Sequence, residues 1–115
     1  MTNANKAKGS RAERQVADYL IGAGLLVERI PAGATADRGD LWVEGTVMPT
    51  IDVKDHKEIT LAAWVDRANE QAENAGRPFG AVWHKRRGKG SPAEWYVTLS
   101  GASFTHLLNR VRRAG

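Results

Sequence analysis

Apolar residues recur every three or four positions near the start of the chain, which predicts an amphipathic helix over residues 10–23. Residues 10–13, Ser-Arg-Ala-Glu, fit a capping box, in which the serine hydroxyl and the glutamate carboxylate bind early backbone amides. Gly24 is expected to end this helix. Its inward stripe consists of Val16, Ala17, Leu20 and Gly24. Residues 1–9 do not continue the pattern and are expected to form a flexible basic arm.

Two later stretches repeat the helical spacing. Residues 60–75 can begin with Thr60 as a cap and stop at Gly76. Residues 103–113 end in arginines, which suit the negative end of a helix dipole. The apolar positions expected to face inward are Leu61, Trp64, Val65, Ala68, Ala72 and Ala75 in the earlier helix, and Phe104, Leu107, Leu108 and Val111 in the later one.

Short runs rich in β-branched and aromatic residues, separated by glycine and proline, predict strands. They cover residues 25–30, 40–44, 50–54, 79–85 and 94–99. A loop of small residues, 31–39, precedes the second run, and a short turn joins the second run to the third, so these two are expected to pair as a hairpin. The order of helices and strands predicts an α/β fold with a central mixed sheet of about five strands flanked by helices. A chain of 115 residues has the size of one domain, expected over residues 10–115.

The composition excludes several kinds of site. The chain has no cysteine, so disulfides, thiolate zinc sites and cysteine nucleophiles are excluded. No apolar run approaches the ~20 residues that cross a bilayer, and the first residues do not form a signal peptide. We therefore expect a cytoplasmic protein that has no membrane partner.

The net charge of +4 favours an anionic partner. The acids lie mostly between Asp37 and Glu73, and the basic residues gather on either side of them. The candidate DNA contacts are Lys8, Arg11, Arg14, Lys85, Arg86, Arg87 and Lys89. A basic periphery around an acidic middle is what a metal-dependent nuclease needs, because it attracts phosphate and also holds metal. A solvated basic surface, or a solvated loop at residues 84–90, is the plain alternative.

Within the acidic middle, strand geometry gathers a specific set of groups. In an extended strand, Asp52 and Lys54 lie on one face. Ile51 and Val53 lie on the other face, toward a helix layer. Asp40 heads the neighbouring strand, so hairpin pairing brings its carboxylate and that of Asp52 within reach of a common ion. Two carboxylates and a backbone carbonyl, here that of Val53, form an ordinary site for a hard divalent cation.

Glu13 lies on the apolar stripe of the first helix and so faces the sheet, where a carboxylate needs a partner. A helix cap is one explanation and a metal-bound water is another. The Asp-x-Lys pattern of residues 52–54 proves little alone, because residues 55–57 repeat it by chance. The earlier copy is preferred because it lies in an alternating strand pattern, and an Asp52–Lys54 ion pair is its plain alternative.

These residues resemble the motifs of the PD-(D/E)XK nuclease superfamily, and within it the small Holliday junction resolvases of archaeal and phage type. The matching segments are residues 8–13 (Lys-Gly-Ser-Arg-Ala-Glu), 38–40 (Arg-Gly-Asp) and 51–54 (Ile-Asp-Val-Lys). The order of helices and strands also matches, and the resemblance implies a restriction-endonuclease-like core. Gly39 stands where the superfamily name has proline, and Asp52 stands where resolvases usually have glutamate.

The resemblance also implies roles for individual residues. Asp40 and Asp52 would bind Mg²⁺, for which Mn²⁺ can substitute. Glu13 would assist at the metal, and Lys54 would be the catalytic lysine. Gln71 fits the place of an auxiliary polar residue on the helix after the lysine. A buried glutamine bonded to backbone is the alternative for Gln71.

Resolvases of this kind are homodimers, because two symmetric cuts are needed across a four-way junction. The candidates for a dimer surface are Trp64, Trp83 and Trp95, although tryptophans in a small chain more often belong to the core.

The sequence therefore predicts an Mg²⁺-dependent, structure-selective DNA endonuclease that resolves Holliday junctions or other branched DNA. It would act in the cytoplasm, or in the host cytoplasm if the chain is phage-encoded. One alternative is a nicking, flap or single-strand nuclease of the same fold. Another is a non-catalytic basic DNA-binding module whose acids form ordinary ion pairs.

Overall fold

The computed structural model describes residues 3–31 and 36–114. Residues 1–2 of the predicted arm and residues 32–35 of the predicted loop lie outside this range. The helices and strands follow one another as α1 (Asn3–Gly22), β1 (Leu26–Arg29), β2 (Leu41–Glu44), β3 (Thr50–Lys54), α2 (Leu61–Ala75), β4 (Gly80–His84), the short 3-10 helix η1 (Pro92–Glu94), β5 (Tyr96–Thr98) and α3 (Gly101–Ala114). The predicted α/β class is confirmed.

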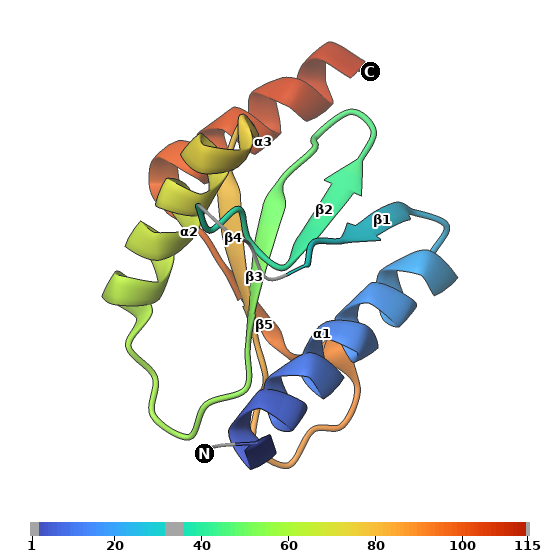
Figure 1. The fold of residues 1–115 in the computed structure, drawn as a ribbon. Helices are drawn as coiled ribbons and strands as arrows, with labels where there is room; N and C mark the ends of the chain where they lie inside the picture. Colours follow the sequence, from blue (N-terminus) through green and yellow to red (C-terminus); the bar gives the residue numbers. More distant parts are fainter. Residues whose placement is uncertain (1–2, 32–35, 115) are drawn as a thin grey trace.

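The strands form one five-stranded mixed sheet, which confirms the predicted architecture (Figure 1). They lie in chain order, and all neighbouring pairs are antiparallel except β3 and β4. These two strands are parallel because α2 carries the chain back across the sheet between them. β3 has the predicted bounds, and the other four strands are shorter than predicted.

The pairing between β2 and β3 covers only part of β3. The two strands pair over Leu41–Ile51 and Trp42–Thr50. The amide of Asp40 also donates to the carbonyl of Ile51, at 3.0 Å. β3 pairs with β4 along its whole length, and from Asp52 onward its ladder to β2 has ended. Asp40 therefore stands where the hairpin opens, opposite the part of β3 that carries Asp52 and Lys54.

Two apolar layers hold the helices on the sheet. On one face, α1 packs on β2 and β3 through Ala12, Val16, Ala17, Leu20, Leu41, Val43, Ile51 and Val53. On the other face, Trp64 and Ala68 of α2 pack on Val82 of β4. Because Ile51 and Val53 face α1, alternation turns Asp52 and Lys54 to the α2 side. The predicted division of β3 into an apolar and a charged face is confirmed by this packing.

The segment that enters β2 depends on Gly39. Its φ is +92°, in the left-handed region that favours glycine, and a Cβ there would overlap with the hydroxyl oxygen of Thr50. That hydroxyl donates to the carbonyl of Arg38 at 2.7 Å. Proline holds φ near −65°. The backbone at position 39 therefore cannot accept the proline that appears in the superfamily's name.

The predicted start of the first helix is wrong. The helix begins at Asn3, so Ser10 and Glu13 lie inside it and do not form a capping box. Residues 3–9 are helical and do not form the expected arm. The helix ends at Gly22, and Gly24 follows with a φ of +94°, as a helix stop requires, but it is exposed and not part of the inward stripe. Thr60 stands before α2, but its side chain makes no capping hydrogen bond within the described residues.

The predicted inward stripe of the last helix is wrong at three of its four positions, and the fourth, Leu107, is half-buried. Phe104, Leu108 and Val111 are about half exposed, and Ser103 is the buried residue that packs toward α2. Its hydroxyl lies 3.3 Å from the side chain of Asn69. Trp64 and Trp95 belong to the buried core and Trp83 packs against it, which agrees with the alternative that these three tryptophans are core residues. Among the described helices, none is long and apolar enough to cross a membrane.

Candidate active site

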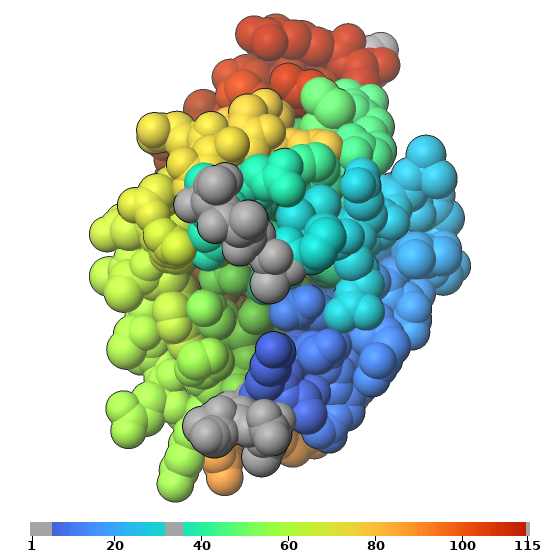
Figure 2. Space-filling model, viewed as in Figure 1, coloured from blue at the N-terminus to red at the C-terminus, as the bar shows by residue number. Residues whose placement is uncertain are grey.

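A pocket of about 550 Å³ lies at the opening of the β2–β3 hairpin. Its walls come from the start of α1, the segment before β2, β3 with the residues after it, and α2. The lining residues are Lys8, Gly9, Glu13, Asp37, Asp40, Asp52, Val53, Lys54, Asp55, His56, Lys57, Arg67 and Gln71. Figure 2 shows this face, with the blue start of α1 and the yellow-green α2 on opposite sides of a recess.

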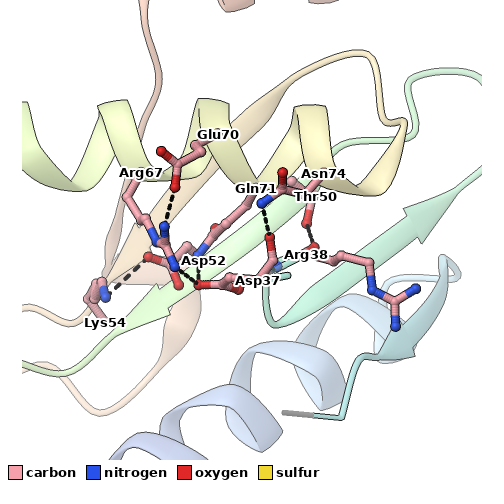
Figure 3. Close-up of polar contacts among 10 residues, drawn as sticks. Asp37, Arg38, Thr50, Asp52, Lys54, Arg67, Glu70, Gln71 and Asn74 are labelled. Atoms are coloured by element: carbon pink, nitrogen blue, oxygen red, sulfur yellow. Dashed lines mark hydrogen bonds and ion pairs between the residues drawn. The ribbon is translucent and has the colours of Figure 1, made fainter. Parts of the chain in front are cut away.

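Asp40 and Asp52 come together because a side-chain oxygen takes the place of a backbone carbonyl in the hydrogen-bond ladder between β2 and β3. Where a neighbouring carbonyl would continue the pairing, Oδ2 of Asp40 accepts the hydrogen bond of the Val53 amide at 2.8 Å. Asp52 is the next residue back along β3, and it is 4% exposed. Lys54 Nζ lies 3.2 Å from Asp52 Oδ2 (Figure 3). The predicted gathering of Asp40, Asp52 and Lys54 is therefore present in the fold.

Burial and the neighbouring carboxylate of Asp52 raise the cost of ionising Asp40. Burial, and then the negative charge of Asp52, raise the pKa of Asp40 to about 8, while the hydrogen bond from Val53 acts in the opposite direction. A positive ion between the carboxyl groups would favour their ionised forms by the same electrostatics.

Glu13 reaches the same pocket from α1. Its Oε1 lies 3.5 Å from a guanidinium nitrogen of Arg29 in β1. Burial raises the pKa of Glu13, and the Arg29 charge partly offsets this effect. Because Glu13 is inside α1, the helix-cap explanation no longer applies. Its role at a metal stays a prediction.

One observation in particular indicates that the carboxylates of Asp40 and Asp52 suit a hard divalent cation. Asp52 Oδ2 is buried and receives no hydrogen bond from the described residues, although it lies near Lys54 Nζ. A buried carboxylate oxygen needs such a partner, and oxygen ligands are the ones that Mg²⁺ prefers. Within the described residues, no three acidic or histidine side chains are already grouped as a complete metal site. Asp40 and Asp52 would hold the ion, with Glu13 turned to Arg29 in this conformation.

Sequence reasoning missed Asp37 and Arg67. Asp37 Oδ2 accepts hydrogen bonds from Arg67 at 3.0 Å and from Gln71 at 2.9 Å (Figure 3). Burial would raise the pKa of Asp37, but the hydrogen bonds from Gly39 and Gln71 and the charge of Arg67 together lower it. The predicted position of Gln71 on the inner face of α2 agrees with its burial, but it binds a carboxylate and not backbone. The spacing of Arg67 and Gln71, one helical turn apart, was the available signal.

Two of the predicted DNA contacts flank the pocket. Lys8 of α1 and Lys85 after β4 approach Asp55 from different elements, at 3.9 and 4.0 Å. Asp55 belongs to the second Asp-x-Lys pattern, and it lies on the pocket wall. It therefore holds two lysines beside the candidate active site.

The other predicted contacts differ in how they are held. Arg86 donates to the Glu94 carbonyl at 3.0 Å and lies over the ring of Tyr96, and Lys89 lies 3.5 Å from the Glu94 carboxylate. Arg11, Arg14 and Arg87 are exposed. The segment after β4 is thus organised by η1 and aromatic rings, which the prediction of a plain basic loop did not include. Its contact with DNA stays a prediction.

No protein-family model and no curated protein matches this sequence. Among solved structures, the chain is similar to that of Archaeoglobus fulgidus Hjc at 1.6 Å resolution, a Holliday junction resolvase from an archaeal hyperthermophile. The similarity covers 78% of this chain and 70% of that chain, with a TM-score of 0.58 and 26% sequence identity. This likeness confirms the resemblance that the motifs indicate, to the small archaeal-type Holliday junction resolvases of the PD-(D/E)XK superfamily.

Proposed function

We propose that this protein is an Mg²⁺-dependent endonuclease that cuts branched DNA, with the four-way junction as its substrate. The observation that carries the proposal is the Asp40–Asp52 pair beside Lys54, in a pocket at the opening of the hairpin. The similarity to Hjc, which is named as a Holliday junction resolvase, supports the choice of substrate.

Several residues in the pocket and beside it have a part in this proposal. Asp40 and Asp52 hold the cation, and the Val53 amide fixes one oxygen of Asp40. When bound, the cation lowers the pKa of a water and neutralises charge on the scissile phosphate. Lys54, 24% exposed at its side chain, stands at the pocket surface and stabilises negative charge that develops on the phosphate. Lys8 and Lys85 attract the neighbouring phosphates.

We further propose that the protein works as a homodimer, because paired cuts in a symmetric junction need two active sites related by symmetry. Sedimentation of the protein with and without junction DNA would test this part. A species of twice the mass of one chain is expected, and a monomer in both conditions would contradict it.

A cleavage panel tests the substrate. Labelled four-way junction, flap, single strand and plain duplex are incubated with the protein, with Mg²⁺ or with EDTA. Paired nicks at symmetric positions, on the junction alone and with Mg²⁺ alone, are expected. Preferred cleavage of the flap or the single strand would assign a different substrate to the same chemistry. Junction binding without cleavage in Mg²⁺ or Mn²⁺ would favour a non-catalytic DNA-binding module.

A further inference from the structure

Asp37 is fastened to α2 by three side chains that lie on successive turns of that helix. Its Oδ2 accepts from Arg67 and Gln71, at 3.0 and 2.9 Å, and its backbone carbonyl accepts from Asn74 at 2.8 Å (Figure 3). Its Oδ1 accepts from the amide of Gly39 at 3.0 Å. Three hydrogen bonds to Asp37 thus connect the segment before β2 with α2.

This connection determines where Asp40 stands. Asp37 holds the amide two residues on, and Asp40 follows directly. On the other side, the amide of Asp40 is fixed to the carbonyl of Ile51 in β3. The backbone that carries Asp40 is therefore held from two elements, and Asp37 supplies the contribution of α2.

Asp37 also determines how the Gln71 amide is turned. A carboxylate accepts hydrogen bonds and donates none, so Gln71 must present its Nε2 to Asp37. Its Oε1 is then left as an acceptor. Gln71 is 2% exposed and lines the pocket, and this Oε1 has no hydrogen-bond partner among the described residues.

Gln71 Oε1 and Asp52 Oδ2 are both buried acceptors that receive no hydrogen bond in the described part of the chain, although Lys54 Nζ lies 3.2 Å from Asp52 Oδ2, and both residues line the same pocket. Buried acceptors need donors. The water molecules that a hard cation keeps around itself are donors of the required kind. The two atoms therefore fit a hydrated cation better than they fit an empty apolar cavity.

We propose that Asp37 is a positioning residue of the metal site: from α2 it holds the backbone that carries Asp40, and it keeps Oε1 of Gln71 as an acceptor in the pocket. This inference rests on the proposed function, because it assumes that the Asp40–Asp52 pair holds a divalent cation. Residues that orient metal ligands in this way typically change metal affinity by about 10- to 100-fold when they are replaced.

The main test is Asp37→Asn, with the affinity for Mn²⁺ measured by calorimetry in the absence of DNA. Asparagine has one acceptor oxygen, which cannot serve the donors of Gly39, Arg67 and Gln71 together. We expect the dissociation constant to rise about tenfold or more. The matched control is Glu70→Gln, which removes the same charge from the other carboxylate that holds Arg67 and does not touch Asp37. Its affinity should stay within about twofold of wild type.

A double variant, Asp37→Asn with Gln71→Glu, exchanges the carboxylate and the amide and keeps the net charge. The new carboxylate accepts from the new amide and still leaves an acceptor in the pocket. We expect most of the Mn²⁺ affinity to return. An exchange variant that binds no better than Asp37→Asn would contradict the role of the amide orientation.

Thermal unfolding in EDTA shows whether each variant is folded. If Asp37→Asn does not fold, Asn74→Ala takes its place, because Asn74 is exposed and holds Asp37 by one hydrogen bond. Loss of that bond should weaken Mn²⁺ binding about two- to tenfold. Wild-type affinity in a folded Asp37→Asn variant, or in Asn74→Ala, would overturn this inference alone. Wild-type protein that binds no Mn²⁺ would overturn the proposed function as well.

Discussion

At the scale of single residues, the site is built from groups that are costly to bury. Asp40 replaces a ladder carbonyl, and Asp52 keeps an oxygen that receives no hydrogen bond from the described residues. Lys54 stands close to that oxygen but belongs to the more exposed end of β3. Burial of the two carboxyl groups costs stability, and buried carboxyl groups of this kind are common at functional sites.

The pKa of Asp40 gives a testable consequence for stability. Its value is about 8 in the folded protein against 3.8 for an ordinary aspartate. The folded protein therefore binds a proton that the unfolded chain releases, and this contribution is present below about pH 4 and lost as the pH rises through about 8. Asp40→Asn removes the titration. In EDTA, it should be more stable than wild type at about pH 9, by about 1 kcal/mol or more, with a smaller difference at about pH 4.

Thermal or urea unfolding of both proteins at the two pH values measures this difference. The comparison between the two proteins cancels the titration of groups that do not interact with Asp40. An Asp40→Asn protein that loses as much stability as wild type between acid and alkaline pH would show that Asp40 does not carry the raised pKa.

At the scale of elements, the site depends on how the chain enters β2. Gly39 lies against Thr50, and its φ of +92° is one that other residues adopt at a cost. We predict that Gly39→Ala lowers the free energy of unfolding by about 2–4 kcal/mol, because it adds backbone strain and a clash. Gly88→Ala is the matched control. Its φ is +78°, but a Cβ there meets no atom of the described residues within 4 Å, so strain alone should cost about 1 kcal/mol.

Urea unfolding of the two variants separates the cost of backbone strain from the cost of the clash with Thr50. Mn²⁺ affinity then shows whether Asp40 is still in place to bind the ion. Gly39→Ala should weaken Mn²⁺ binding, whereas Gly88→Ala should not. Equal losses of stability in the two variants would mean that the contact with Thr50 contributes nothing.

Sequence patterns predicted the elements and part of the site for identifiable reasons. Strand alternation places Asp52 and Lys54 on one face whatever the register of the neighbours, and Asp40 follows because a short hairpin constrains pairing. The Asp37–Gln71 contact spans 34 residues along the chain, and no local pattern encodes it. The start of α1 was misplaced because Ser10 and Glu13 satisfy a capping rule that the longer helix makes unnecessary. The burial of the apolar residues of α3 was predicted wrongly for another reason. Their spacing predicts an amphipathic helix but does not show that its apolar face is covered.

At the scale of the whole molecule, the chain has a net charge of +4, and its pocket is lined by both acidic and basic side chains. Asp55 holds Lys8 and Lys85 on its rim. We predict that Lys8→Ala with Lys85→Ala weakens junction binding at low salt and reduces the slope of log affinity against log salt by about one to two. Arg112→Ala, near the end of α3 and outside the pocket lining, should leave the slope unchanged.

Binding titrations at several salt concentrations, in Ca²⁺ or EDTA to prevent cleavage, provide the slopes. An unchanged slope in the double variant would remove these two lysines from the DNA interface, while leaving the roles of the carboxylates open.

The assignment of this pocket as the active site is tested most directly by the rate of Mg²⁺-dependent cleavage of a four-way junction. Wild-type protein and Asp52→Asn are compared at protein concentrations that saturate the junction. Asparagine keeps the size of the side chain and removes the charge that the cation requires. The expected result is paired cleavage by wild type and a loss of about 10³-fold or more in the variant, with junction affinity kept within about threefold. Cleavage by Asp52→Asn at the wild-type rate would contradict the assignment of this pocket as the active site.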